Sequence, residues 1–268
     1  MLVQLLGIPT DVNSSYQRGP ATAPAAIRRA WQRYQQFGNM ATECGLEIGR
    51  DLLLEDLDDV PITESPADHD VIAAAAADAA RLGPLLSIGG DHSVTFPLVE
   101  GLARVHGPLN LLHFDAHSDL YDDYEGNPRS HACPFARIME RNLAKRLVQV
   151  GVRTWNTHTR AQAEHFGVEV VEWDGFTPDR VPIPDGPLYV TIDLDALDPA
   201  FAPGVSHPEP AGLSVRDIVA TLARINSRLV GADIVELNPL RDVSDATAVV
   251  AVKLLKELAS AAGRTHGR

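Results

Sequence analysis

Asp115, His117 and Asp119 stand two residues apart from one another, directly after the apolar run 109–114 (LNLLHF). An apolar run that ends abruptly in acidic and imidazole groups is typical of a buried strand whose carboxyl end opens into a site. Residues two apart in a strand point the same way, so Asp115 and His117 share a face, and Asp119 joins them if the chain turns there. Carboxylates packed this closely repel one another unless a cation lies among them. The spacing therefore predicts a metal site.

A second apolar run ends in the same way. Residues 188–192 (LYVTI) are followed by Asp193 and Asp195, which would share one face of the strand. His92 follows a shorter apolar run and two glycines, which would let the backbone turn sharply at the strand end. Glu236 stands near the carboxyl end of the last predicted strand. A histidine after two glycines is weak evidence alone, but the shared position at strand ends predicts one common site.

The candidate metal ligands are four aspartates and two histidines: His92, Asp115, His117, Asp119, Asp193 and Asp195. They carry a charge of about −4, which two divalent ions would cancel. Oxygen ligands with some imidazole and no thiolate favour manganese over zinc or copper, although cobalt, iron and nickel stay open. Two such ions, roughly 3.5 to 4 Å apart, can share a water molecule and lower its pKa, which predicts a hydrolase. A calcium site is the less favoured alternative because histidine is a poor calcium ligand.

The elements that must position these residues alternate between strand and helix. Strands are predicted at 2–8, within 52–60, and at 85–88, 109–114, 147–153, 168–171, 188–192 and 230–239. Helices are predicted from 23, at 67–82 and 94–105, up to about 165, and at 214–224 and 247–262. This alternation predicts one α/β domain over 1–268, with a parallel sheet that binds ligands at the carboxyl ends of its strands. We expect residues 263–268 to form a frayed tail.

The composition restricts partners and compartment. The chain has 268 residues and a formal net charge of −13, which argues against nucleic acid or an acidic membrane as partner. A small cationic substrate is compatible with this charge, although acidity for solubility alone explains most of it. Cys44 and Cys133 are the two cysteines and lie far apart, as expected in a reducing compartment. The first residues lack a basic signal-peptide region, and no long apolar run occurs, so we predict a cytoplasmic protein.

Two polar loops are candidates for the walls of the site. The loop at 13–20 is either such a wall or an ordinary connection between strand and helix. The loop at 120–131 lies directly downstream of the Asp115 stretch, and its His131 would be a proton carrier that titrates near neutral pH. Without that role, His131 would be an ordinary loop histidine. We predict that Cys133 is a buried structural thiol and not a nucleophile, because no base is specified beside it.

Four segments together resemble the signatures of the arginase/agmatinase (ureohydrolase) family. They are GGDHS at 89–93, DAHSD at 115–119, DLDALDP at 193–199 and VELNP at 235–239, in the family's order. The stretches 13–21, 125–127, 130–140 and 198–207 further resemble plant-type arginases. The resemblance implies a three-layer α/β/α fold with a mainly parallel sheet and two Mn²⁺ ions per subunit. It also implies hydrolysis of a guanidino group to urea and a homotrimer or homohexamer.

The resemblance also implies individual roles. One ion would be held by His92, Asp115, Asp119 and Asp193, and the other by His117, Asp115, Asp193 and Asp195. Asp119 would in addition pass a proton to the leaving amine, and His131 would exchange protons with solvent. Glu236 would hold the substrate guanidinium. We expect the tail of the substrate to meet residues of the 120–131 loop and its surroundings, namely Tyr121, Asn127, Arg129 or Asn156.

The substrate is predicted from the resemblance alone. We favour L-arginine, cleaved to L-ornithine and urea. Agmatine and guanidino acids are the alternatives, because the 120–130 loop lacks the Asn and Thr/Ser-rich pattern of animal arginases, and a formimino substrate is a further one. More remote alternatives are a zinc amide hydrolase of the deacetylase type and a non-catalytic oligomeric binding protein. Ligands His92, Asp119 and Asp195 argue against the single-metal deacetylase type.

Overall fold

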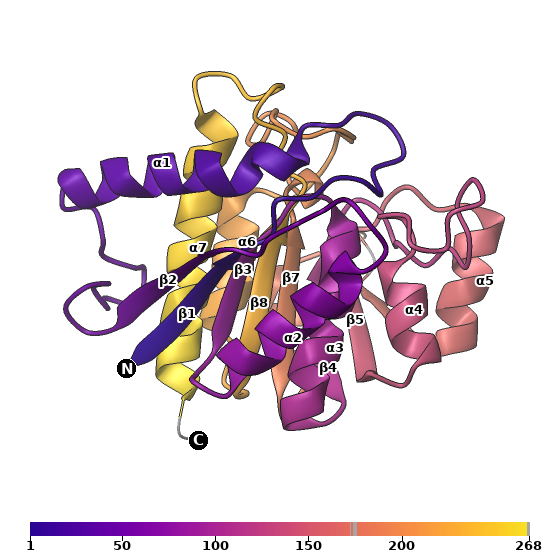
Figure 1. Cartoon of the computed structure of the whole chain (residues 1–268), viewed down its shortest axis with the longest axis horizontal. Helices are drawn as coiled ribbons and strands as arrows, with labels where there is room; N and C mark the ends of the chain where they lie inside the picture. The colour runs from indigo at the N-terminus through magenta and orange to yellow at the C-terminus, as the bar shows by residue number, and fades with distance from the viewer. Residues whose placement is uncertain (172, 174–175, 267–268) are drawn as a thin grey trace.

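A central parallel sheet organises the protein. The computed structural model describes residues 1–171, 173 and 176–266. Its strands are β1 Leu2–Gly7, β2 Leu53–Asp59, β3 Leu85–Ile88, β4 Leu109–Phe114, β5 Ala144–Val150, β6 Glu169–Val171, β7 Leu188–Asp193 and β8 Leu229–Val235. Across the sheet they lie in the order β2-β1-β3-β8-β7-β4-β5-β6, and every neighbouring pair is parallel in the described part of the chain (Figure 1).

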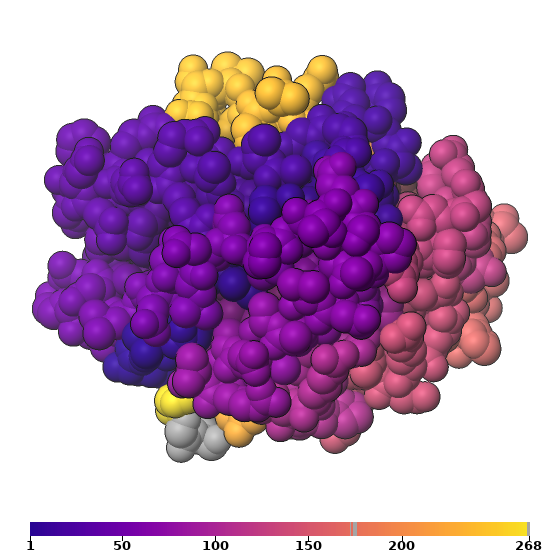
Figure 2. All heavy atoms as spheres, viewed as in Figure 1, coloured from indigo at the N-terminus to yellow at the C-terminus, as the bar shows by residue number. Residues whose placement is uncertain are grey.

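Helices cover both faces of the sheet. One face carries α1 Ala23–Gln36, α6 Val215–Ala223 and α7 Ala246–Thr265, which share an apolar core with the strands. The other face carries α2 Asp68–Ala80, α3 Thr95–His106, α4 Pro134–Glu140 and α5 Thr157–Phe166 around a second core. The segment that holds α2 and its flanking loops occupies the centre of the surface seen in Figure 2. The predicted three-layer α/β/α class is confirmed.

The central strands are buried along their whole length. Every residue of β3, β4, β7 and β8 is buried. A strand covered on both faces needs a nearly continuous apolar sequence, and this is why these strands read as apolar runs.

No helix among the described residues is both long and apolar enough to cross a membrane.

The strand order brings the predicted site residues to one edge. His92 follows β3, Glu236 follows β8, Asp193 ends β7 and Asp115 follows β4. These four strands are successive neighbours in the middle of the sheet, and parallel strands end at the same edge. Residues from four distant parts of the sequence therefore meet above the carboxyl ends of the strands.

The structure differs from the sequence prediction at several element boundaries. Helix α7 extends to Thr265, so the prediction of a frayed tail from residue 263 is wrong for its first three residues. The Thr265 hydroxyl donates to Ala261 and accepts from the backbone N–H of Leu229, which attaches the helix end to β8. Residues 267–268 of the predicted tail lie outside the described residues. The sequence analysis also did not predict α4.

Candidate functional site

The first carboxylate cluster surrounds one nitrogen of His92. The ring Nε2 of His92 lies 3.0 Å from Thr191 Oγ1, which orients the other nitrogen, Nδ1, away from β7. Carboxylate oxygens of three aspartates converge on Nδ1, at 3.0 Å for Asp115, 3.1 Å for Asp119 and 3.2 Å for Asp193. All four side chains are buried.

The second cluster surrounds His117 and shares Asp115 with the first. His117 Nδ1 lies 3.0 Å from Asp195 Oδ2 and 3.3 Å from Asp115 Oδ1. Asp115 therefore presents Oδ1 to one imidazole and Oδ2 to the other. Asp193 also contacts both clusters. Its Oδ2 lies 3.2 Å from His92 Nδ1, and its Oδ1 accepts from the backbone N–H of Asp195 at 2.8 Å. The structure thus brings together all six predicted ligands around the shared Asp115.

These donor atoms fit divalent metal ions. His92 Nδ1 is buried and makes no hydrogen bond to another described residue, although three carboxylate oxygens lie within 3.2 Å of it. A nitrogen lone pair and several carboxylate oxygens that face a common point are what an N/O metal site requires. His117, Asp115 and Asp195 form a second group whose ligand atoms lie within 4.8 Å of one another. The sharing of Asp115 between two groups suits a pair of ions.

The electrostatics of Asp193 and Asp195 support the same conclusion. Burial raises the pKa of Asp193 well above its ordinary value, and the neighbouring Asp195 and Asp115 raise it further. Burial, with the Asp115 carboxylate close by, also raises the pKa of Asp195 to about 6. Crowded buried carboxylates hold protons this tightly because their negative charges lack enough positive charge nearby, and metal ions would supply it.

His131 and Glu236 form a buried pair beside the aspartates. His131 Nδ1 lies 2.8 Å from Glu236 Oε1, and the same oxygen accepts from the backbone N–H of His92 at 2.8 Å. Burial disfavours the charged imidazole, yet Glu236 outweighs it, with Asp91 and Asp119 adding to the effect, and the pKa of His131 rises to about 9. The prediction that His131 titrates near neutral pH is therefore wrong for the metal-free chain, because the Glu236 carboxylate stabilises the charged ring. Glu236 is thereby held next to the first cluster with its charge intact.

Two of the predicted catalytic residues have left-handed backbone conformations. Asp119 has φ of 48° and Glu236 has φ of 65°. Such conformations cost a residue with a Cβ about 1 kcal/mol or more, and they recur at functional sites where the surrounding structure enforces them. At Asp119 this is the turn that the sequence analysis required for the side chain to join Asp115 and His117.

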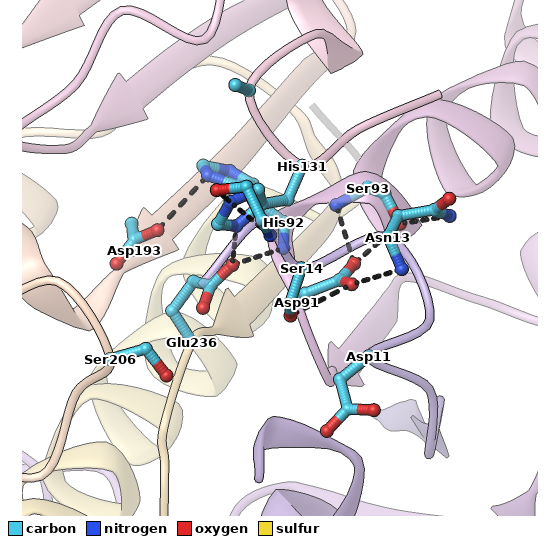
Figure 3. A network of polar contacts seen from close by, with 12 residues as sticks. Asp11, Asn13, Ser14, Asp91, His92, Ser93, His131, Asp193, Ser206 and Glu236 are labelled. Carbon is cyan, nitrogen blue, oxygen red and sulfur yellow. Dashed lines mark hydrogen bonds and ion pairs between the residues drawn. The ribbon is translucent and has the colours of Figure 1, made fainter. Parts of the chain in front are cut away.

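The loop at 13–20 forms part of the site wall. Asp91 Oδ2 accepts from the backbone N–H of Asn13 at 3.0 Å and from the Ser14 hydroxyl at 3.2 Å (Figure 3). The Asn13 carbonyl accepts from the backbone N–H of His131 at 3.1 Å. Ser15 completes the contact, since its Oγ lies 2.8 Å from His131 Nε2. The loop therefore holds both the backbone and the ring of His131.

The sequence analysis did not single out Ser15 or Asp91 as site residues. Their signals were present but ambiguous: Ser15 belongs to a polar loop that could equally be a plain connection, and Asp91 stands between two glycines and the histidine that drew attention. The two glycines also have a reason other than the expected turn. A Cβ on Gly90 would lie 1.6 Å from the Thr10 carbonyl oxygen, so close backbone packing requires glycine there.

A cavity of about 210 Å³ opens onto the clusters. Four of the six predicted ligands line it, namely His117, Asp119, Asp193 and Asp195, together with His131 and Glu236. The other lining residues are Ser15, Ser118, Tyr121, Tyr124, Ala132, Thr154, Thr159 and His207. The His207 ring lies 5.2 Å from that of His131 and 6.1 Å from that of His117. The sequence analysis included His207 only as the end of the 198–207 stretch that resembles plant-type arginases.

The residues expected around the substrate tail separate into two groups. Tyr121 lines the 210 Å³ cavity, and the Asn156 amide donates to its hydroxyl. Asn127 and Arg129 instead line a neighbouring cavity of about 400 Å³. The Asn127 amide donates to Asn13 Oδ1 at 3.2 Å and so supports the wall between the two cavities.

Cys133 also lies on the far side of that wall. Its side chain lines the 400 Å³ cavity and is buried. Burial raises the pKa of its thiol to about 12, and the carboxylate of Asp119 raises it as well. A thiol with so high a pKa is almost entirely protonated at neutral pH, which makes it a poor nucleophile.

Comparison of the sequence with known proteins gives a consistent result. The sequence profile of the arginase family matches residues 2–260. Arginase 1, mitochondrial, from Arabidopsis thaliana is 46% identical, over 96% of this chain and 80% of that protein. An agmatinase from Bacillus anthracis is 31% identical, over 96% of this chain and 90% of that protein.

Solved structures give the same result. An arginase from Medicago truncatula superposes with a TM-score of 0.90 at 42% identity, covering 97% of this chain and 87% of that chain. A proclavaminate amidino hydrolase from Streptomyces clavuligerus has a TM-score of 0.86 at 30% identity, covering 98% of this chain and 92% of that chain.

Proposed function

Because the chain belongs to the arginase family, we propose that this hydrolase cleaves the guanidino group of L-arginine to give L-ornithine and urea. The observation that carries the proposal is the pair of carboxylate–imidazole clusters that share Asp115 beside Glu236, at one cavity. The similarity to proteins named arginases supports arginine as the substrate.

We propose that the site holds two Mn²⁺ ions. His92, Asp115, Asp119 and Asp193 would bind one ion, and His117, Asp115, Asp193 and Asp195 would bind the other. Four carboxylates with two imidazoles and no thiolate are a donor set that suits manganese. Two bound ions would lower the pKa of a water molecule and supply a hydroxide nucleophile near neutral pH.

The protein's own groups would orient the substrate and move protons. Glu236 would accept charge-assisted hydrogen bonds from the guanidinium and turn its central carbon toward the clusters. Asp119 Oδ2 faces His92, so Oδ1 would carry the proton to the leaving amine. His131 would exchange protons with solvent, since its ring touches both Glu236 and the Ser15 hydroxyl in the cavity wall.

The cavity lining is compatible with the amino-acid head of arginine. Apart from the proposed ligands, His131 and Glu236, its described lining residues carry hydroxyl, imidazole or methyl groups. Hydroxyls such as those of Tyr121, Thr154 and Thr159 can serve both the ammonium and the carboxylate of an amino-acid head.

The oligomer, the compartment and the rest of the site follow as further proposals. We propose a homotrimer or homohexamer and a cytoplasmic location, with neither nucleic acid nor a membrane as partner. Tyr121 would meet the substrate directly. Asn127 would act only through the loop, because its side chain contacts Asn13 and lines the neighbouring cavity.

The test is urea release by the Mn²⁺-loaded protein with arginine, agmatine, 4-guanidinobutyrate and 3-guanidinopropionate measured side by side. Preference for arginine is the expected result. Preference for another of the four would keep the reaction and change the substrate. No urea from any of them, with two Mn²⁺ bound per subunit, would overturn the substrate class and direct attention to formimino compounds.

A further inference from the structure

His113 lies directly behind the shared aspartate and uses both of its ring nitrogens. His113 Nε2 is 2.7 Å from Asp115 Oδ2, and His113 Nδ1 is 3.0 Å from the side-chain nitrogen of Gln149. His113 on β4 and Gln149 on β5 are partners in the parallel register. Both side chains are fully buried, at 0% exposure.

The hydrogen bonds of Gln149 determine where the proton on His113 lies. The Gln149 amide nitrogen donates to the Ser118 carbonyl at 2.6 Å and has a second hydrogen directed at His113 Nδ1. Nδ1 must therefore accept, and the ring proton is on Nε2. His113 consequently donates a hydrogen bond to Asp115 Oδ2, the oxygen that also faces His92.

Packing fixes the plane of the His113 ring. The ring stacks on Phe135 of α4, with centroids 3.9 Å apart and planes 28° apart. Phe135 in turn meets the His92 ring edge-on, with centroids 5.3 Å apart. His113 and the ligand His92 are thus held by one aromatic side chain, so neither ring can turn without disturbing Phe135.

We propose that His113 and Gln149 are positioning residues for the metal centre, which orient the Asp115 carboxylate for both ions. This inference rests on the proposed metal site and deepens it. His92, His113 and Asp115 are close enough to form a ligand group themselves, but both nitrogens of His113 are occupied by hydrogen bonds. Hydrogen-bond donors to a ligating carboxylate typically change metal affinity 10- to 100-fold when they are removed.

The test compares two buried glutamines. Gln149→Met removes the amide that sets the His113 proton and keeps an unbranched side chain of similar length. Gln4→Met on β1 is the matched control, because Gln4 is equally buried and neither of its side-chain polar atoms has a hydrogen-bond partner among the described residues. Mn²⁺ affinity and the number of ions per subunit are measured by titration calorimetry on the metal-free full chain.

We expect Gln149→Met to weaken Mn²⁺ binding about 10- to 100-fold while the number of sites stays at two, and Gln4→Met to bind like wild type. His113→Phe preserves the stack on Phe135 and should weaken binding as strongly. Because Gln149 acts through His113, the double variant should bind no more weakly than His113→Phe alone. Equal affinities of the two glutamine variants, additive losses in the double variant, or loss of one site in His113→Phe would each overturn the proposal.

Thermal unfolding of the metal-free variants shows which of them are folded, and His113→Phe keeps the test decisive if Gln149→Met does not fold. Urea release is measured separately on wild type. Wild type that binds two Mn²⁺ without releasing urea would contradict the proposed function and leave the affinity comparison intact.

Discussion

Glu236 and His131 share a 2.8 Å contact between Oε1 and Nδ1, and the backbone N–H of His92 reaches the same oxygen. One carboxylate therefore joins a predicted metal ligand to the predicted proton carrier. Glu236 follows β8 and His131 lies in the loop after β4, with β7 between these strands in the sheet. With the proposed guanidinium contact at Glu236, this pair would link the orientation of the substrate to the protonation of His131.

Glu236→Gln should release the substrate and retain the metal. The amide keeps the size of the side chain but loses the charge that would pair with the guanidinium. Because a charge-assisted hydrogen bond contributes about 1.5 to 3 kcal/mol, we expect kcat/KM to fall about 100-fold, mainly through KM. Steady-state kinetics and metal analysis measure this, with the exposed Glu164→Gln as control. An unchanged KM would contradict the guanidinium contact.

Asp119→Asn should lose both turnover and metal. Asp119 Oδ2 lies 3.1 Å from His92 Nδ1, and an amide is a weaker ligand that cannot carry the proton to the leaving amine. We expect urea release to fall at least 1,000-fold, with less than two Mn²⁺ retained after dialysis. Asp70→Asn, on the exposed face of α2, is the control. Near-normal activity of Asp119→Asn would show that Asp119 neither binds an essential metal ion nor carries the proton to the leaving amine.

Ser15→Ala tests whether the N-terminal loop serves the reaction. The change removes the hydroxyl 2.8 Å from His131 Nε2, while the backbone N–H of Ser15 remains 3.2 Å from the same nitrogen. We expect kcat to fall about 10-fold with KM and Mn²⁺ content unchanged, since proton exchange through His131 would slow. The pH profile of kcat should move in Ser15→Ala, and Ser15→Thr should restore it. A profile identical to wild type would make Ser15 structural only.

The meeting of the candidate ligands could be predicted from the sequence because they lie at or just after the ends of apolar runs. The end of a buried parallel strand can be recognised from the apolar composition of the strand. Asp115, Asp193 and His92 belong to this group. The contact of Gln149 with His113 could not be predicted, because a glutamine inside an apolar strand gains this partner only when β5 lies next to β4. The position of Asn127, which lines the neighbouring cavity, could not be predicted for another reason. Which of two cavities a loop side chain lines depends on contacts such as that to Asn13, which join residues far apart in sequence.

Metal binding should depend on pH through the buried aspartates. The pKa of Asp195 is raised to about 6 in the folded chain, mainly by burial, whereas an unfolded aspartate has a pKa of about 3.9. The folded, metal-free protein therefore takes up a proton more readily than the unfolded chain, so this contribution to stability is present at low pH and is lost as pH rises through about 6. A metal ion binds the ionised carboxylate, so the affinity of the protein for Mn²⁺ should increase as pH rises over this range.

We expect thermal unfolding of the chelator-treated protein to move to lower temperature between about pH 4 and about pH 6, the interval between the unfolded and folded pKa values of Asp195. The gain in stability on adding Mn²⁺ should grow over the same range, reaching about 3 kcal/mol at a hundredfold excess over Kd. Differential scanning calorimetry with and without Mn²⁺ measures both trends. In Asp195→Asn, which cannot titrate at this position, both trends should be smaller. A Mn²⁺ effect that is the same at every pH would mean that no proton leaves Asp195 when metal binds.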